Sequence, residues 1–257
     1  MALCAALPDK ICQFRRLQLL SSQLVQLRRE TIAVKGKRKR IEAFEILGLK
    51  DPLENSDKIP VRFLDDFRKG VDLIQIPEDI ILPVEALDGC IGHSRTVALL
   101  AFALACQFDF SDREKSDLVN AAFVADLGKE IIPHHLLNRR GSLTTSEFET
   151  VRNHPVESTR ILRKMGYENP AMLEMVQHTH EYFNGRGYPH GLAGEKIPMG
   201  SRIIAVADAY DALTARRPYR DPWERQSTLE EIRRGVSKGM YDPQVADALI
   251  RLLGSAV

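Results

Sequence analysis

The chain has 257 residues, of which 44% are hydrophobic and 28% are charged. A chain of this length and composition forms one or two globular domains with a buried core, which excludes a miniprotein, bulk disorder and a fibrous repeat. Its 36 basic and 35 acidic side chains nearly cancel, so no strong field attracts a nucleic acid polymer or an anionic membrane. Any anionic ligand must therefore be bound by a local cluster of side chains.

Cysteine usage and apolar segments both indicate a cytoplasmic protein. The four cysteines are scattered along the chain without a C-x-x-C pair, as expected for reduced thiols. Residues 1–7 are apolar but lack the basic segment of a secretory signal. The most apolar stretch, residues 97–106, is about half of the roughly 20 residues that a membrane helix needs. We therefore expect a core helix there and no membrane span.

The N-terminal segment predicts an amphipathic helix over residues 10–30. Leucines recur there at helical steps of three and four, at Leu17, Leu20, Leu24 and Leu27. This stripe is too short for a sustained coiled coil. Two interpretations remain open. One is packing within the chain, and the other is a seam that joins two copies in a homodimer or a helix that receives a signal.

Residues 31–47 change character and predict a β-hairpin. Apolar β-formers lie on both sides of a Lys35-Gly36 turn. The basic run at residues 37–40 is interpreted as a solvated face of this hairpin. A binding site for phosphates is the less favoured interpretation of the same run.

The chain divides into two regions of different pattern. Residues 1–85 are predicted to form a small accessory region, which includes a loop rich in Gly, Pro, Asn and Asp at residues 48–62. Residues 86–257 are predicted to form the main domain, because helical periodicity continues almost to Leu253 with only Gly and Pro interruptions. The expected fold class is therefore all-α, a helical bundle with an N-terminal addition.

Two pairs of charged residues lie three positions apart within this helical region. Asp126 and Lys129 flank Gly128, which is expected to end a helix and expose both side chains. Asp208 and Asp211 belong to an otherwise apolar helix, where burial of an unpaired carboxylate is costly. A metal ion would relieve that cost, so the pattern indicates a metal site.

The helical region also contains an ordered set of motifs. They are Gly92-His93-Ser94, Ala125-Asp126-Leu127-Gly128-Lys129 with Ile132-Pro133, Leu143-Thr144 with Glu147, His154-Pro155, His180-Glu181 with Gly185-Arg186-Gly187-Tyr188-Pro189, and residues 208–214 with Arg217-Pro218-Tyr219-Arg220. A single Gly-Tyr-Pro sequence is weak evidence, but the complete ordered set is specific. Over residues 88–254 the chain resembles the HD-GYP family, the metal-dependent branch of the HD superfamily that hydrolyses cyclic di-GMP.

The resemblance implies an HD-domain helical bundle with a metal-dependent phosphodiesterase site. It places metal ligands at His93, Asp126, His154, His180 and Asp208, with Asp126 bridging two ions. Imidazole and carboxylate ligands suit iron, manganese or zinc, and the resemblance favours iron or manganese. Two ions would clamp the scissile phosphate and supply a hydroxide nucleophile. Lys129 would stabilise negative charge on the phosphoryl oxygens.

The resemblance also assigns residues around the metals and the cyclic dinucleotide. Tyr188 would pack against the ligand, and Arg217 and Arg220 would reach its phosphates as charged donors. A surface pair at a helix end is the alternative interpretation of the two arginines. Asp211 is expected to cap the helix or contact a ligand rather than bind metal itself. In the family the Gly-Tyr-Pro loop also contacts other signalling domains, which are therefore expected partners.

Two positions depart from the family pattern. Ala125 stands where the HD dyad has its histidine, and Thr179 replaces the first histidine of the family's His-His-Glu. Neither side chain is a good ligand for a divalent ion, so each metal position is expected to lose one ligand. His178 would replace the lost ligand only through local distortion, because a shift of one residue rotates a helical side chain by about 100°. His134 and His135 are expected to be solvent-exposed loop residues.

These observations lead to a first hypothesis and an alternative. The first is a module that binds cyclic di-GMP or a partner with weak or no hydrolysis, because the phosphate-facing residues are intact while two ligands are missing. The alternative is an active phosphodiesterase that cleaves cyclic di-GMP to the linear dinucleotide pGpG and then to GMP. A nucleotide phosphohydrolase of the broader HD class is a third interpretation, and the Gly-Tyr-Pro loop argues against it.

Overall fold

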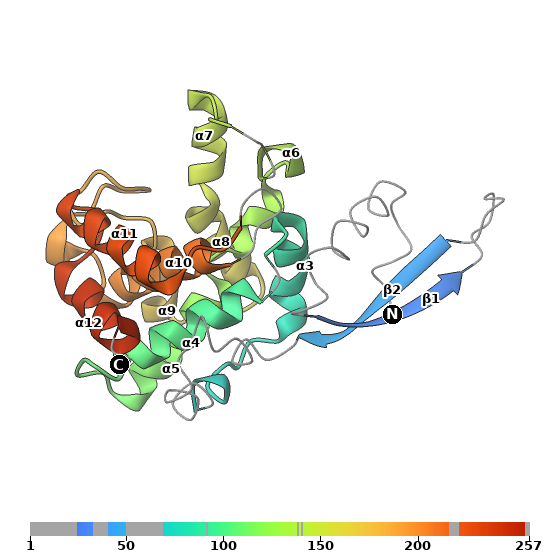
Figure 1. The fold of residues 1–257 in the computed structure, drawn as a ribbon, viewed down its shortest axis with the longest axis horizontal. Coiled ribbons are helices and arrows are strands. Elements are labelled where there is room, and N and C mark those ends of the chain that lie inside the picture. Colours follow the sequence, from blue (N-terminus) through green and yellow to red (C-terminus); the bar gives the residue numbers. More distant parts are fainter. Residues whose placement is uncertain are drawn as a thin grey trace.

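The computed structural model describes residues 25–32, 41–49, 69–90, 92–137, 139, 141–215 and 221–254, with side chains from residue 69 onwards. Helices dominate these residues, and a two-stranded sheet precedes them (Figure 1). The elements are β1 (Val25–Ile32), β2 (Ile41–Leu49), α3 (Glu78–Asp88), α4 (His93–Ala105), α5 (Asp112–Val124), η3 (Leu127–Ile131), α6 (His134–Leu137), α7 (Thr145–Arg152), α8 (His154–Lys164), α9 (Pro170–Gln177), η4 (Gly194–Lys196), α10 (Met199–Thr214), α11 (Arg225–Ser237) and α12 (Pro243–Gly254).

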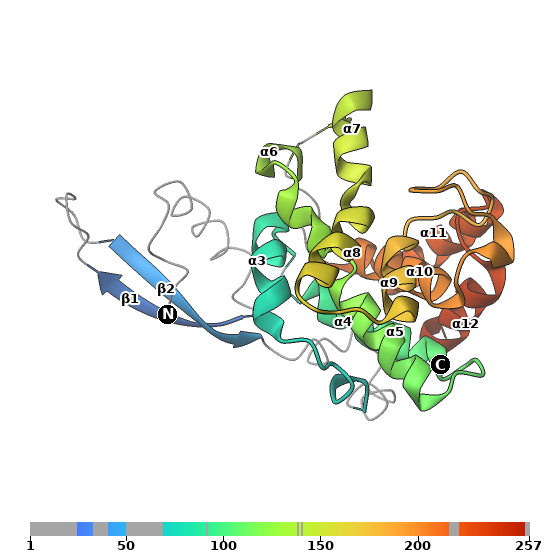
Figure 2. The same cartoon turned by 180° about the vertical axis from the view of Figure 1, so that it is seen from behind.

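The N-terminal sheet corrects one prediction and confirms another. Strands β1 and β2 pair antiparallel from Val25 opposite Leu49 to Ile32 opposite Ile41. This confirms strand pairing in the predicted hairpin region, but β1 begins at Val25 rather than at residue 31. The predicted helix is wrong for residues 25–30, because hydrogen bonding to β2 along the whole of β1 outweighs the local helical spacing of the leucines. Figures 1 and 2 show the hairpin outside the helical bundle. The rest of the predicted helix, the turn and the basic run lie outside the described residues.

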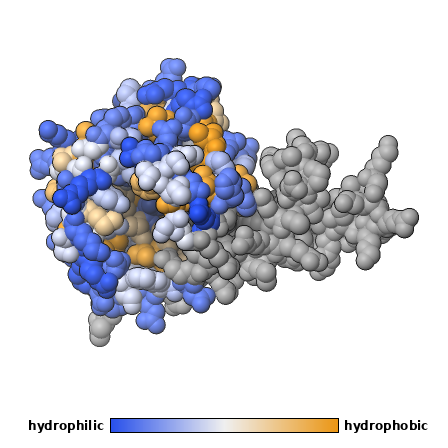
Figure 3. Space-filling model, turned by 90° about the horizontal axis from the view of Figure 1, so that it is seen from above, coloured by the Kyte–Doolittle hydropathy of each residue, from blue (hydrophilic) through white to orange (hydrophobic). Residues whose placement is uncertain are grey.

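Helix α4 forms the centre of the bundle. It packs against α5, α10 and α12, and its residues from Val97 to Ala105 are all buried. This confirms the prediction of a core helix in the most apolar stretch. No helix among the described residues is both long enough and apolar enough to cross a membrane. The outer face of the bundle in Figure 3 is mainly hydrophilic, with smaller apolar areas between.

A close contact between η3 and α8 fixes the segment that carries Asp126. A Cβ atom on Gly128 would lie 2.0 Å from the carbonyl oxygen of His154, so only glycine allows this approach. The buried Ser158 hydroxyl accepts from the Gly128 N–H and donates to the Ala125 carbonyl, both at 2.7 Å. The prediction that Gly128 ends a helix is wrong. Helix α5 ends at Val124, and Gly128 instead serves the packing of η3 on α8.

One of the sequence motifs has a plain structural explanation. The Thr144 hydroxyl and the Glu147 carboxylate form a capping box at the start of α7. Such reciprocal hydrogen bonds satisfy backbone N–H groups that have no partner within the helix. The motif therefore fixes the start of α7. Helix α7 projects from the bundle in Figures 1 and 2.

Candidate metal centre

Side chains from five separate segments converge on one centre. The five predicted ligands form two groups of three residues. Within each group the ligand atoms lie within 4.8 Å of one another, and Asp126 belongs to both groups. We call Asp126, His154 and His180 the imidazole-rich group. We call His93, Asp126 and Asp208 the carboxylate-rich group. The structure thus brings together all the residues that the sequence predicted as metal ligands.

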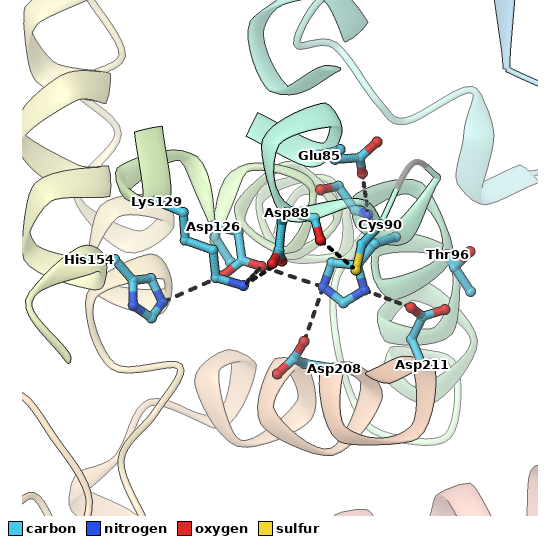
Figure 4. Close-up of polar contacts among 12 residues, drawn as sticks. Glu85, Asp88, Cys90, Thr96, Asp126, Lys129, His154, Asp208 and Asp211 are labelled. Carbon is cyan, nitrogen blue, oxygen red and sulfur yellow. Dashed lines mark hydrogen bonds and ion pairs between the residues drawn. The ribbon is translucent and has the colours of Figure 1, made fainter. Parts of the chain in front are cut away.

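His93 is positioned by the start of α4. Gly92 precedes it with a φ of 85°, a conformation that favours glycine. The carboxylate of Glu85 accepts hydrogen bonds from the N–H groups of Gly92 at 2.8 Å and Ser94 at 2.7 Å (Figure 4). Burial raises the pKa of Glu85, although these hydrogen bonds oppose the rise. Sequence inspection missed Glu85, because the residues it contacts lie in a different helix.

Three carboxylates surround the imidazole of His93. Its Nδ1 lies 2.6 Å from Asp211 Oδ2, and its Nε2 lies 3.1 Å from Asp208 and 3.5 Å from Asp126 (Figure 4). Burial lowers the pKa of His93, but its contacts with Asp126, Asp208 and Asp211 outweigh burial and raise it. A carboxylate on Nδ1 directs Nε2 toward a metal. Asp211 therefore contacts the candidate ligand from outside the group, as the sequence led us to expect.

The imidazole-rich group has a different support. Nδ1 of His154 lies 2.9 Å from the Val151 carbonyl oxygen, which is an acceptor only, so Nδ1 carries the proton. The Nε2 of His154 faces Nε2 of His180 at 3.0 Å and Oδ1 of Asp126 at 3.5 Å. Burial and the neighbouring His154 lower the pKa of His180 to about 4. His180 is therefore neutral, as a metal-binding imidazole must be, and its Nε2 faces the same point as Nε2 of His154.

Lys129 lies against the shared carboxylate. Its Nζ is 2.6 Å from Oδ2 of Asp126 and 3.4 Å from Oδ2 of Asp88, at the end of α3 (Figure 4). Burial opposes the charged form of Lys129, but Asp126, Asp88 and Asp208 outweigh it and raise the pKa of the amine. Asp88 was missed by the sequence analysis, since no local spacing connects it with a residue 41 positions away.

Tyr188 forms an aromatic wall beside the imidazole-rich group. Its ring stacks on His180 with centroids 5.1 Å apart, and Phe148 of α7 meets it edge-on at 6.1 Å. A Cβ atom on Gly187 would lie 2.1 Å from the backbone nitrogen of Tyr182, so glycine is required for the loop to pack here. Phe148 is 44% exposed. The sequence analysis missed Phe148, because a single aromatic residue in a polar helix gives no signal.

The two positions that depart from the family pattern both line the cleft at the candidate metal centre. Ala125 and Thr179 line it together with residues of both ligand groups. The Thr179 hydroxyl donates to the Val176 carbonyl oxygen at 3.2 Å and is thus occupied by its own backbone. Neither side chain supplies a ligand.

The remaining sequence candidates lie elsewhere. Arg217 and Arg220 are outside the described residues. Within the described part of the chain, neither His134 nor His135 belongs to a group of potential metal ligands. His178 lies in a separate group with Glu181 and His190, so it does not replace the missing ligand at position 179.

The donor set fits a pair of divalent metal ions. It combines imidazole nitrogens and carboxylate oxygens, and one carboxylate reaches both groups. Contacts on the opposite nitrogens of His93 and His154 leave their Nε2 atoms pointed inward. Such supporting contacts are typical of metal-binding histidines.

Comparison with known proteins identifies the family. The sequence model of a family described as the HD domain matches residues 75–245, which are more than half of the chain. The chain belongs to the HD domain family. It also resembles the solved structure of Bd1817, an HDG"Y"P protein from Bdellovibrio bacteriovorus, with a TM-score of 0.57 and 17% identity. The match covers 93% of this chain and 98% of that one, and it shows a common fold.

Two relatives with named activities match the helical region. A cyclic di-GMP phosphodiesterase from Pseudomonas aeruginosa is 38% identical over 163 residues, which are 63% of this chain and 39% of the relative. A 3'3'-cGAMP-specific phosphodiesterase from Vibrio cholerae is 35% identical over 159 residues, which are 62% of this chain and 37% of the relative. This chain thus spans less than half the length of either relative.

Proposed function

We propose that this HD-GYP chain is a metal-dependent phosphodiesterase that hydrolyses a cyclic dinucleotide, with cyclic di-GMP as its substrate. The products are the linear dinucleotide pGpG and then GMP. The observation that carries the proposal is the pair of three-ligand groups that share Asp126. The names of the two relatives support the same substrate class. This proposal reverses the order of the two hypotheses from the sequence, because both ligand groups keep three donors despite Ala125 and Thr179.

The metal ligands are His93, Asp126, His154, His180 and Asp208, with iron or manganese as the proposed metal. When bound, a pair of such ions would polarise a phosphoryl oxygen and would lower the pKa of water enough to supply a nucleophile at neutral pH. Three protein ligands for each ion would leave room for water and substrate to bind.

Lys129 and Tyr188 supply the chain's own contribution to phosphate chemistry. Lys129 stays protonated, and its two carboxylate contacts leave one N–H for a phosphoryl oxygen. Burial raises the pKa of Tyr188, so its hydroxyl remains a hydrogen-bond donor. We assign Arg217 and Arg220 to the phosphates of the ligand as charged donors. Lys129 would then meet the charge that develops on the transferring phosphoryl group.

Phe148 extends the binding surface beyond the metals. Its exposed ring stands edge-on to Tyr188 on the side of α7. Aromatic side chains stack on nucleobases whatever the base. We assign Phe148 and Tyr188 to one base of the cyclic dinucleotide.

Binding without hydrolysis is the second candidate function. The observation that favours it is the position of Ala125 and Thr179 in the cleft, where the family pattern has ligands. Such a chain would act as a receptor, and contact of the Gly-Tyr-Pro loop with another signalling domain stays a prediction.

One experiment separates the two candidates. The chain is purified without oxygen, loaded with iron or manganese, and incubated with cyclic di-GMP or 3'3'-cGAMP beside an Asp126→Ala control. We expect pGpG and GMP from cyclic di-GMP, with little product from the control. Calorimetric binding without product would support the receptor and overturn the phosphodiesterase. Absence of both binding and product would overturn both.

A further inference from the structure

A third group of potential metal ligands lies outside the candidate metal centre. It consists of His178, Glu181 and His190, whose ligand atoms lie within 4.8 Å of one another. His178 directly follows α9 as its C-cap residue, and Glu181 begins the loop that carries the Gly-Tyr-Pro sequence. His190 follows Pro189 in that loop. The group therefore spans the two ends of the segment that presents His180 and Tyr188 to the metal centre.

Glu181 is the fixed member of the group. Its side chain is completely buried, and its two oxygens accept hydrogen bonds from the N–H groups of His190 at 2.7 Å and Leu192 at 3.1 Å. These bonds bring the loop back onto the start of the segment. A carboxylate oxygen that accepts one hydrogen bond still has a further lone pair. Glu181 can therefore hold the loop and bind a cation at the same time.

His178 lacks the partner that a buried polar atom needs. Its Nδ1 is buried and has no hydrogen-bond partner, and it lies 3.7 Å from Oε1 of Glu181. This separation is too long for a hydrogen bond. Two ligand atoms bonded to one tetrahedral zinc ion lie about 3.4 Å apart, given bonds of about 2.1 Å. The separation in the structure is close to that value.

His190 completes the group from the solvent side. Its ring centroid lies 5.1 Å from that of His178 at an angle of 59°, so the two rings are tilted rather than stacked. His190 is exposed while His178 and Glu181 are largely enclosed. An ion can therefore enter from solvent and keep water as a further ligand.

We propose that His178, Glu181 and His190 bind one zinc ion, which links the end of α9 to the Gly-Tyr-Pro loop. Two imidazoles and one carboxylate form a ligand set that zinc prefers. This site is separate from the centre around Asp126 and does not depend on the proposed phosphodiesterase activity. It gives His178 a role other than replacing the ligand missing at position 179.

Zinc binding by variants of the full chain tests the proposal. Asp126→Ala removes the carboxylate shared by both groups of the main centre, and it serves as the background. We expect this variant to retain one zinc ion per chain in elemental analysis after dialysis. Adding His190→Ala is expected to weaken zinc binding by at least roughly 100-fold, since loss of even an outer contact typically costs about 10- to 100-fold.

His135→Ala in the same background is the matched control, because His135 is exposed and belongs to none of the ligand groups among the described residues. We expect it to leave zinc binding unchanged. Equal zinc content with and without His190→Ala would overturn the proposal, and so would an Asp126→Ala chain that binds no zinc. Thermal unfolding of each variant without metal identifies any general loss of folding. The activity of the unmodified chain is measured separately, so failure of this site and failure of the phosphodiesterase proposal are distinguishable.

Discussion

The two ligand groups of the candidate metal centre share Asp126 but differ in chemistry. The carboxylate-rich group combines one imidazole with two carboxylates, and a third carboxylate, Asp211, contacts the same imidazole from outside. The imidazole-rich group combines two imidazoles with one carboxylate, and the ring of Tyr188 covers His180. The first group therefore has more carboxylates than the second, whereas the second has more imidazoles and is partly covered by an aromatic ring.

Because their ligands differ, the two proposed metal positions are not equivalent. Carboxylate oxygen favours manganese and other hard ions, while imidazole favours iron or zinc. We therefore expect the two ions to bind with different affinities and to respond separately to substitution.

Removal of one imidazole from each group gives the largest effect. His93→Ala is expected to remove the ion of the carboxylate-rich group, and His180→Ala that of the imidazole-rich group. Each variant should retain one ion and lose more than about 100-fold in turnover, because loss of a direct ligand exceeds the cost of an outer contact. Elemental analysis and product formation measure both quantities. Loss of both ions in either variant would show that the two groups do not act separately.

Asp211→Asn tests the support of His93 from outside the group. An amide in place of the carboxylate no longer fixes the imidazole as a metal ligand, so metal affinity should fall by roughly 10- to 100-fold. Metal titration should show this loss at one ion only. An equal loss at both ions, or none, would contradict the assignment of Asp211 to the carboxylate-rich group. Because Asp211 is fully buried, thermal unfolding without metal serves as the control.

Restoring the family's histidines should act in the opposite direction. Ala125→His and Thr179→His together are expected to raise metal affinity by roughly 10- to 100-fold. We expect turnover to rise with metal content, and the single variants should each tighten one ion. If the unmodified chain already binds two ions and restoration does not change turnover, the two departures have no functional cost.

Phe148→Ala should give the smallest effect. Loss of one stacking contact is expected to raise the KM for cyclic di-GMP by roughly 10-fold, with kcat and metal content unchanged. Met165→Ala is the matched control, because Met165 is also exposed, at 45%, and lies at the opposite end of α8 from the ligand His154. A fall in kcat without a change in KM would argue against a role in binding the base.

Sequence patterns determined much of the fold. The apolar run at residues 97–106 indicated the central helix, and the ordered motifs indicated the HD-GYP bundle. They also supplied the five ligand residues that the structure brings together. The central helix depends on residue type and spacing within one segment, and the bundle was indicated by an ordered set of motifs. Spacing and motif order can each be read directly from a sequence. The predicted helix over residues 10–30 is wrong at residues 25–30, because pairing with β2 decided the conformation there.

Contacts between side chains of different segments could be found only from the tertiary structure. Asp88 reaches Lys129, Glu85 caps the helix that begins at His93, and Phe148 faces Tyr188 because helices from different parts of the chain pack together. His178 lies with Glu181 and His190 rather than in the metal centre around Asp126. This too follows from packing, because the loop returns onto the end of α9. Sequence spacing determines which side chains share a helix face, whereas contacts between segments depend on packing at the scale of single atoms.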